Sequence, residues 1–307
     1  MEKKDYFRLE EECEFRFRSM GPCYHLCTGE DSPLLFHKEE SFRVAMDIVA
    51  FTLALFTDIA ILTFQLMSNH LHFALCGREE RIRLWFGKLV SSLASHPALA
   101  ESKKAISALE PRIFPVESLE NMRNVIAYIN RNGFIVDYNH TPFSYPWGAN
   151  RYFFNAEAKL RYESMKEKAT MRWKRQAFHS NLADNLTDIF LMDGYVSPFC
   201  FCNVGTAESL FRNAQHYFSK IAKSIETSAS IARMIEESLY YLDDELYSIV
   251  VGICTREYNC KSPSMIPAQA KLALARKMRF DYNASVKQIS RILKLDVNSV
   301  KGIFPEI

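Results

Sequence analysis

Apolar residues along the first half of the chain recur with two different periods. Helix-like spacing, in which apolar residues return every three or four positions, covers residues 39–56, 81–94 and 118–132. Strand-like runs lie at residues 22–28, twice within 58–77, and at 112–116. The predicted order is therefore strand, helix, strand, strand, helix, strand, helix, which is typical of a split βαβ arrangement.

This order predicts an α+β fold, a ferredoxin-like or RNA-recognition-like antiparallel sheet with helices on one face, over about residues 20–150. Ser68-Asn69 is predicted to form the turn between the two central strands, because asparagine tolerates left-handed geometry. The last helix is expected to end at Gly133, a usual C-terminal cap. Residues 1–20 mix charged and aromatic residues and predict an exposed arm or an added edge element.

Helical patterns dominate the second half of the chain. Residues 157–175 hold seven Lys and Arg against three Glu, which predicts a basic helix. Such a helix suits either a solvated linker or a face that contacts nucleic-acid phosphates. Residues 188–198, punctuated by Gly194, are expected to begin a new unit. Further helices are predicted at about residues 206–224, 229–242 and 243–254.

The last forty residues have the pattern of a helix-turn-helix over about residues 268–304. Lys271 to Lys301 holds eight Lys and Arg against two Asp, so the local charge suits DNA. A plain three-helix packing module is the alternative. The residues expected in its core are Ile289, Ile292, Leu293, Leu295 and Val300. The expected DNA contacts are Asn298, Ser299 and Lys301, with Lys287 and Arg291 on phosphates.

These patterns predict a chain of three parts, at residues 1–155, 156–187 and 188–307. The parts are an α+β domain, a basic linker helix and an all-helical DNA-binding region. The total of 307 residues is long enough for two domains with separate cores. The net charge of +2 does not itself indicate nucleic-acid binding, so that role depends on local clusters.

Cysteine spacing and hydropathy bear on the compartment. Eight cysteines are scattered without a CxxC pair, which does not resemble a disulfide framework or a zinc ribbon, so we expect a reducing cytoplasm. The charged N-terminus is unlike a cleavable signal peptide. The longest apolar run, near residues 48–62, is broken by polar residues and is too short to span a bilayer.

Two histidines near the start of the strand after the predicted turn are candidate metal ligands. Side chains two apart in a strand point to the same face, so His70 and His72 project together, about 6.5 Å apart along the chain. Two imidazoles form half of a divalent-metal site and need one or two further ligands. A chance pair on a polar sheet face is the alternative.

The third predicted helix carries residues that can complete such a site. Tyr128 and Asn132 are four apart and therefore share one helical face, about one turn apart. A tyrosine hydroxyl attacks phosphorus effectively once a metal ion polarises the phosphodiester. The amide oxygen of Asn132 can reach the same ion as a third ligand. Together with the two histidines, these residues predict a phosphoryl-transfer site.

Several segments resemble a known family. Residues 67–72, Met-Ser-Asn-His-Leu-His, resemble the HUH motif of single-tyrosine HUH transposases, and more narrowly the M-P-N-H-x-H of REP-associated tyrosine transposases. Residues 128–133 are similar to the Y-I-x-x-N-P of that family's catalytic helix. Residues 142–152 resemble its P-W-S-S-Y segment, and residues 24–28 resemble its first strand. The resemblance covers about residues 20–155.

The resemblance implies a function and a role for each site residue. His70 and His72 hold Mg²⁺ or Mn²⁺, Asn132 completes the ligand set, and Tyr128 attacks a single DNA strand. The products are a 5′-phosphotyrosine and a free 3′-hydroxyl, and rejoining needs no nucleotide cofactor. The implied substrate is a single-stranded hairpin, and the C-terminal region is a candidate for duplex contact. A homodimer associated with the bacterial nucleoid is also implied.

Other candidates in the first half have weaker support. His25 can face the sheet near the metal, but a structural histidine is the favoured interpretation. Gln65 is interpreted as a sheet residue. Tyr138 and Tyr145 are alternative nucleophiles, but they lie in a proline-rich loop without an amide four residues on.

Two departures from the family pattern and two alternative functions remain open at this point. Ser68 and Gly133 stand where the family has proline, which changes backbone stiffness and removes no chemical group. A domesticated relative would cleave and join repeats without moving an element. A catalytically inactive DNA-binding regulator would keep the HUH fold only as a scaffold.

Overall fold

The computed structural model describes residues 3–29, 33–136, 145–180, 182–183, 186–223, 243–282 and 284–304. The chain divides into two compact units, Met1–Ser224 and Ile225–Ile307, and each is described by itself. The described residues between 156 and 223 belong to the first unit, which differs from the predicted division at residues 155 and 187. Among the described residues, no helix combines the length and apolar character that a membrane span requires.

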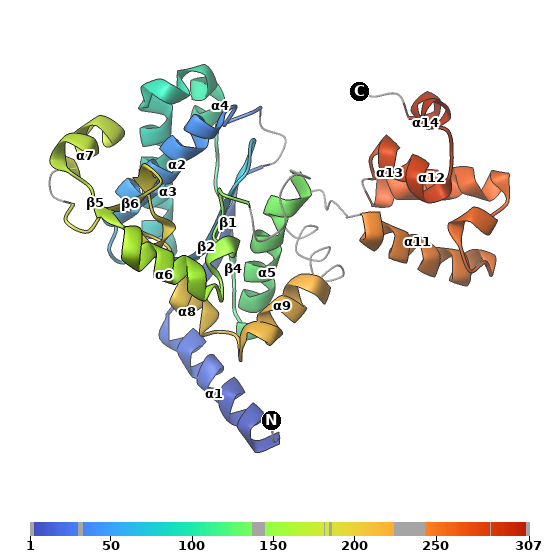
Figure 1. Cartoon of the computed structure of the whole chain (residues 1–307), viewed down its shortest axis with the longest axis horizontal. Coiled ribbons are helices and arrows are strands. Elements are labelled where there is room, and N and C mark those ends of the chain that lie inside the picture. Colours follow the sequence, from blue (N-terminus) through green and yellow to red (C-terminus); the bar gives the residue numbers. More distant parts are fainter. Residues whose placement is uncertain are drawn as a thin grey trace. The chain divides into compact units, whose positions relative to one another are not determined.

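Four strands of the first unit form one antiparallel sheet in the order β2-β3-β1-β4 (Figure 1). They are β1 (Cys23–Cys27), β2 (Ala60–Leu66), β3 (Leu71–Cys76) and β4 (Arg112–Pro115). The predicted mixed α+β class and antiparallel sheet are confirmed. The turn between β2 and β3 closes at the predicted place, where the Met67 N–H donates to the His70 carbonyl at 2.9 Å.

Helices cover both faces of this sheet, so the prediction of helices on one face is wrong. Figure 1 shows α2 (Glu39–Ala54) and α3 (Glu79–Ser95) on one side of the sheet and α5 (Leu119–Val136) on the other. Phe73 of β3 points to the first side, where its ring lies 5.2 Å from that of Trp85. All six residues of β3 are buried, so both faces of the strand need a covering layer.

Helix α5 is longer than the sequence predicts. It continues through Gly133 to Val136, so the expectation that Gly133 ends the helix is wrong. A glycine inside a helix costs about 1 kcal/mol relative to alanine, and burial of the apolar face of α5 outweighs that cost. The buried apolar residues of this helix are Leu119, Met122, Val125, Ile126, Ala127 and Ile129.

The N-terminal residues form a docked helix where the sequence indicates an arm or an edge element. Helix α1 (Lys3–Ser19) buries Cys13 and Phe17, which are 2% and 6% exposed. The guanidinium of Arg123 on α5 donates to the Glu10 carboxylate of α1. This contact ties the first helix to the layer that carries Tyr128.

The segment after α5 protects the edge strand β2. The Leu66 N–H donates to the Trp147 carbonyl at 2.8 Å, so residues 145–149 add backbone pairing to the edge of the sheet. Gly148 approaches this edge closely, because a Cβ atom there would collide with the side chain of Gln65. The segment that resembles P-W-S-S-Y therefore lies beside the strand that precedes the histidine pair.

Residues 156–223 fold onto the first unit as short elements. The predicted single linker helix is instead α6 (Ala156–Met165) and α7 (Met171–Phe178), since Asn155 and Thr170 each cap a separate helix. The ring of Phe178 stacks on Phe51 of α2 at 4.7 Å. Among the described residues, the first unit also contains η1 (Pro97–Ser102), α4 (Lys103–Ser107), η2 (Asn150–Tyr152), β5 (Glu167–Lys168), β6 (Phe190–Met192), β7 (Tyr195–Val196), η4 (Pro198–Cys200), α8 (Val204–Glu208) and α9 (Ala214–Lys223).

Two expectations for the middle of the chain differ from the structure. The segment at residues 188–198 does not begin a new unit: it forms the β6–β7 hairpin, whose Val196 N–H donates to Asp47 of α2 at 2.6 Å. The helix predicted at residues 206–224 is interrupted, because α8 ends at Glu208 and α9 begins at Ala214. The helix predicted at residues 229–242 lies outside the described residues.

The described part of the second unit is helical, as predicted. Its elements are α11 (Asp243–Tyr258), η5 (Pro263–Met265), α12 (Ala268–Asp281), α13 (Val286–Leu293) and α14 (Val297–Ile303). Three residues separate α13 from α14, and Lys294 adopts the left-handed conformation that ends α13. The predicted core residues Ile289, Ile292, Leu293 and Val300 are buried, and Leu295 packs against them.

A disulfide joins β1 and β3, the two strands in the middle of the sheet. Cys23 of β1 and Cys76 of β3 lie opposite each other, with Cα atoms 4.2 Å apart. This bridge differs from the expectation drawn from the scattered cysteines, because Cys23 and Cys76 are 53 positions apart in the sequence and meet through strand pairing.

Candidate functional site

Imidazole side chains from two neighbouring strands gather on the sheet face beneath α5. In the register of β1 and β3, His25 pairs with Ala74 and Cys27 pairs with His72. Alternate residues of a strand share a face, so His25, Cys27 and His72 all project to the same side. His70 precedes β3 directly, and its ring lies 4.9 Å from that of His72, nearly perpendicular to it. Strand pairing thus assembles residues that the sequence separates by almost fifty positions.

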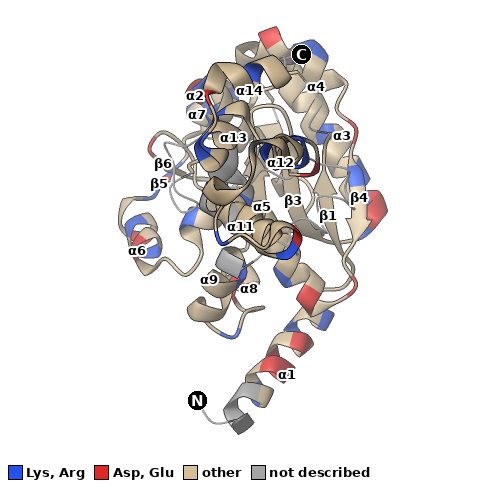
Figure 2. Cartoon of the chain, turned by 90° about the vertical axis from the view of Figure 1, so that its right-hand side faces the viewer, with Lys and Arg blue, Asp and Glu red and all other residues tan. Residues whose placement is uncertain are grey.

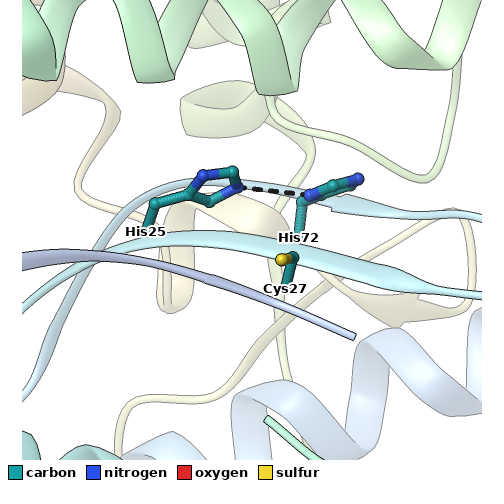
Figure 3. A group of neighbouring side chains, drawn as sticks. All are labelled: His25, Cys27 and His72. Atoms are coloured by element: carbon teal, nitrogen blue, oxygen red, sulfur yellow. Dashed lines mark hydrogen bonds between the residues drawn. The ribbon is translucent and has the colours of Figure 1, made fainter. Parts of the chain in front are cut away.

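His25 and His72 contact each other. His25 Nε2 lies 3.3 Å from His72 Nδ1, and the ring centroids are 5.5 Å apart (Figure 3). His70 Nδ1 lies 2.8 Å from the side-chain oxygen of Asn69. In the tautomer in which His70 Nδ1 donates to this amide oxygen, its Nε2 keeps a lone pair. The contact with Asn69 is therefore compatible with His70 as a metal ligand.

Tyr128 reaches this cluster from the opposite layer. Its ring lies 5.8 Å from that of His72 and 5.9 Å from that of His25, edge-on in both cases. The structure thus brings the predicted nucleophile and the predicted histidine pair together, although α5 and β3 are distant in sequence. The Tyr128 side chain is only 2% exposed. Asn132 lies one turn further along α5, and its side chain is outside the described residues.

Sequence reasoning missed Cys27 and favoured a structural role for His25. The structure instead places both in a group with His72, in which the three ligand atoms lie within 4.8 Å of one another. Two imidazoles and a thiol in this arrangement can hold a metal ion. The alternation of His25 and Cys27 along one strand is the signal in the sequence. Their meeting with His72 depends on the register of β1 and β3, which the sequence does not reveal.

Burial keeps the two central imidazoles neutral. Removal from water lowers the pKa of His72 to about 3, and it lowers the pKa of His25 well below its ordinary value, with the nearby His72 adding to the effect. A neutral imidazole is the form that binds metal ions. His25 Nδ1 is buried and has no hydrogen-bond partner among the described residues, as is also true of Arg43 Nε, Gln65 Nε2 and Trp85 Nε1.

The weaker candidates have structural roles or lie outside the described residues. The Tyr145 hydroxyl donates to the Leu66 carbonyl at 2.8 Å and so holds the segment that covers β2. Gln65 is a buried residue of β2 and packs against Gly148. Tyr138 lies outside the described residues.

The residues expected to contact duplex DNA lie on α13 and α14 of the second unit. All five side chains are exposed: Lys287, Arg291, Asn298, Ser299 and Lys301. Figure 2 marks the basic residues on these helices. The Ser299 hydroxyl also bonds to the Asp296 carboxylate at 3.2 Å, so it helps to cap α14.

Comparison of the chain with protein-family models, with curated proteins and with solved structures finds no match. The site itself is therefore the basis for assigning a function.

Proposed function

We propose that the protein is a metal-dependent, single-strand DNA endonuclease and strand transferase in which Tyr128 is the nucleophile. One observation carries the proposal: the Tyr128 ring on α5 lies 5.8 Å from His72, whose ring lies 4.9 Å from His70. A nucleophile and a pair of metal-binding groups from opposite layers meet at one place. That combination supports phosphoryl transfer more than it supports a polar sheet face.

The residues present fit a divalent ion such as Mg²⁺ or Mn²⁺. His70 and His72 would hold it, with the amide of Asn132 as third ligand. Two imidazoles and one amide oxygen suit Mn²⁺ and tolerate Mg²⁺, which prefers oxygen ligands. The contact between Asn69 and His70 Nδ1 is compatible with the same role. A bound ion supplies the positive charge that polarises the phosphodiester.

The tyrosine carries out the covalent step. Its hydroxyl oxygen attacks phosphorus, a new O–P bond forms, and the bond from phosphorus to the 3′-oxygen breaks. The proton lost by Tyr128 is balanced by protonation of the departing 3′-oxygen. In the reverse direction a 3′-hydroxyl attacks the phosphotyrosine and restores the strand. The covalent bond conserves the energy of the phosphodiester, so no nucleotide cofactor is needed.

The exposed basic residues of the second unit support a separate role in DNA binding. If α13 and α14 act as a helix-turn-helix, the exposed Lys287 and Arg291 contact phosphates, and Asn298, Ser299 and Lys301 are the candidates for base contacts. The substrate we propose for the first unit is a hairpin-forming single strand. A homodimer is part of the same proposal.

Burial of the nucleophile favours a second candidate function. With Tyr128 at 2% exposure and His72 at 0%, the described arrangement is closed, and a DNA strand reaches Tyr128 only if covering groups move. A catalytically inactive DNA-binding regulator, which keeps the site as a packed core, is consistent with this burial. Covalent capture distinguishes the two functions.

The deciding experiment incubates the full chain with Mn²⁺ and end-labelled hairpin oligonucleotides. The wild type is expected to form a protein–DNA adduct that survives denaturant, and Tyr128→Phe is expected to form none. Tyr24→Phe on the opposite sheet face is the matched control and should retain the adduct. His70→Ala with His72→Ala should abolish the adduct, because no ion then polarises the phosphate.

Two outcomes contradict the proposal. An adduct that forms equally well with Tyr128→Phe excludes this tyrosine as the nucleophile. Absence of any adduct with the wild type over a panel of hairpins, together with retained binding of duplex DNA, supports the regulator instead.

A further inference from the structure

We propose that His25, Cys27 and His72 form a second metal site, selective for thiophilic ions of the Zn²⁺ class, and that its occupation withdraws His72 from the proposed catalytic ion. The metal site itself stands on the geometry of β1 and β3. Its regulatory consequence rests on the proposed function. The ligand is the metal ion alone, without an organic cofactor.

The distances between donor atoms fit a tetrahedral ion. Nitrogen ligands bind zinc at about 2.0–2.1 Å, so two of them at a tetrahedral angle lie about 3.3 Å apart. His25 Nε2 and His72 Nδ1 are 3.3 Å apart without any ion. The Cys27 sulfur lies within 4.8 Å of both histidine ligand atoms. With zinc at about 2.3 Å from sulfur and about 2.0–2.1 Å from nitrogen, the sulfur must lie about 3.6 Å from each nitrogen, so the cysteine side chain has to move closer to the histidines to complete three of the four tetrahedral positions.

Strand pairing holds these donors in place. Cys27 and His72 are direct partners across β1 and β3, and His25 stands two residues from Cys27 on the same face. The disulfide between Cys23 and Cys76 links the same two strands. Figure 3 shows the two imidazoles side by side above the sheet, with the Cys27 sulfur next to them. Few degrees of freedom remain to be lost on binding, which favours affinity.

The chemistry of the donor set selects the ion. One thiol and two imidazoles, with no carboxylate among them, match Zn²⁺ and disfavour Mg²⁺, which prefers oxygen. All three side chains are fully buried, so the bound ion would be shielded from bulk solvent, with at most one water molecule beside it. Binding converts the Cys27 S–H bond to an S–metal bond and releases that proton to solvent. The fourth position is left for a water molecule.

Occupation of this site changes His72. Its Nδ1 faces His25, and Figure 3 shows the second ring nitrogen on the far side of the ring. A neutral imidazole with a metal ion on Nδ1 carries its proton on Nε2, and that nitrogen then has no lone pair for another ion. The ion shared with His70 consequently loses a ligand. Zinc-class ions and the proposed catalytic ion therefore exclude each other at His72.

The first test measures binding without DNA. Co²⁺ titrated into the full chain is expected to produce a thiolate-to-metal charge-transfer band that saturates at one equivalent. Cys27→Ser removes the only sulfur ligand of the site and should abolish the band, and His25→Ala should weaken Co²⁺ binding by about tenfold or more. Cys202→Ser is the matched control, since Cys202 is also buried in the first unit, and it should keep the band.

A second variant excludes the neighbouring sulfurs. Cys23→Ser with Cys76→Ser removes the disulfide and should retain the Co²⁺ band if Cys27 is the ligand. Absence of the band in the wild type overturns the proposal. A band that persists in Cys27→Ser overturns it as well, because the thiolate then comes from elsewhere.

The second test measures regulation as a ratio within each protein. Adduct formation with Mn²⁺ is compared with and without added Zn²⁺, and the wild type is expected to lose about tenfold, with excess Mn²⁺ restoring it. In Cys27→Ser, added Zn²⁺ should reduce adduct formation by a much smaller factor. If the wild type forms no adduct at all, the proposed function fails while the Co²⁺ band still decides the metal site. An adduct insensitive to Zn²⁺ in a protein that shows the band overturns the regulatory part.

Discussion

Asp47 is a carboxyl group buried between α2 and the β6–β7 hairpin. It is 7% exposed and accepts a hydrogen bond from the Val196 N–H at 2.6 Å. Burial raises the pKa of Asp47 to about 7, although the Val196 bond and the charge of Arg43 oppose the rise. The folded protein therefore holds a proton on this side chain at pH values where the unfolded chain has released it.

The sign of the resulting pH dependence follows from linkage. A carboxyl group with a raised folded-state pKa contributes stability that is complete below its unfolded pKa and is lost as pH rises through about 7. Between pH 5 and pH 8 the wild type should lose about 3 kcal/mol through Asp47. Asp47→Asn keeps an acceptor for the Val196 N–H and does not titrate. Between pH 5 and pH 8 the free energy of unfolding of this variant should therefore fall by about 3 kcal/mol less than that of the wild type. Urea unfolding followed by tryptophan fluorescence at the two pH values measures the difference.

A constant difference between Asp47→Asn and the wild type at both pH values would contradict this expectation. It would mean that the Asp47 carboxyl is ionised in the folded state throughout the range. Arg43→Gln is a useful comparison, because loss of its charge should raise the pKa of Asp47 further and move the fall in stability to higher pH.

The sequence predicts site residues whose relation is local and misses those whose relation is set by strand register. His70 and His72 are two residues apart and Tyr128 lies in a helix pattern, so each is a candidate from the sequence, whereas their meeting depends on the packing of α5 on the sheet. Cys27 and His25 become part of the site only because β1 pairs with β3 in one register. A shift of one residue would turn both to the other face. The burial of Asp47 is also not predicted, since the hydrophobic pattern of α2 does not indicate which acidic residue is buried.

At the scale of elements, strand and helix positions in the sheet domain follow the hydrophobic pattern closely. The layering does not follow from it. Every residue of β3 is buried, including His72, and a strand buried on both faces needs cover on both, without indicating which helix supplies it. The docking of α1 is also invisible to the pattern, because it depends on Arg123 of α5 meeting Glu10 across a long sequence distance.

Helix α13 begins with a capping box formed by Ser285 and Gln288. The Ser285 hydroxyl accepts from the Gln288 N–H at 3.2 Å, and the Gln288 side chain accepts from the Ser285 N–H at 3.0 Å. Ser285→Ala removes one of these bonds and should destabilise α13 by about 1 kcal/mol. Hydrogen exchange followed by mass spectrometry of peptides over residues 284–304 should show about fivefold faster exchange.

Ser91→Ala is the control for this change, because Ser91 lies exposed within α3 and caps no helix. Its exchange in the second unit should equal that of the wild type. Unchanged protection of residues 284–304 in Ser285→Ala would show that tertiary packing of Ile289 and Leu293 alone holds the start of α13.

At the scale of the whole molecule, the proposed chemistry and the predicted duplex contacts lie in different units. The basic composition of residues 157–175 indicates a linker, yet α7 and the β6–β7 hairpin pack onto α2 of the first unit. Amino-acid composition indicates which residues are exposed to water, but it does not indicate which elements they pack against. The division therefore falls after Ser224, later in the chain than the charge pattern indicates.

The helix-turn-helix interpretation makes a quantitative prediction about salt. Each phosphate contact on B-DNA contributes about 0.9 to the slope of log affinity against log salt concentration. Lys287 and Arg291 are exposed on α13 and are the two expected phosphate contacts. Lys287→Gln with Arg291→Gln should therefore lower the slope by about 2 and weaken binding about equally for different duplex sequences. Fluorescence anisotropy over a range of salt concentrations measures both quantities.

The matched control removes two charges from the first unit. Lys103 and Lys104 are exposed on α4, and Lys103→Gln with Lys104→Gln changes the net charge by the same amount as the α13 variant. If net charge alone attracts DNA, both variants flatten the slope equally. If α13 contacts phosphates, only the variant in the second unit does so. A slope unchanged in both would place the duplex contacts on another surface and leave α13 and α14 as a packing module.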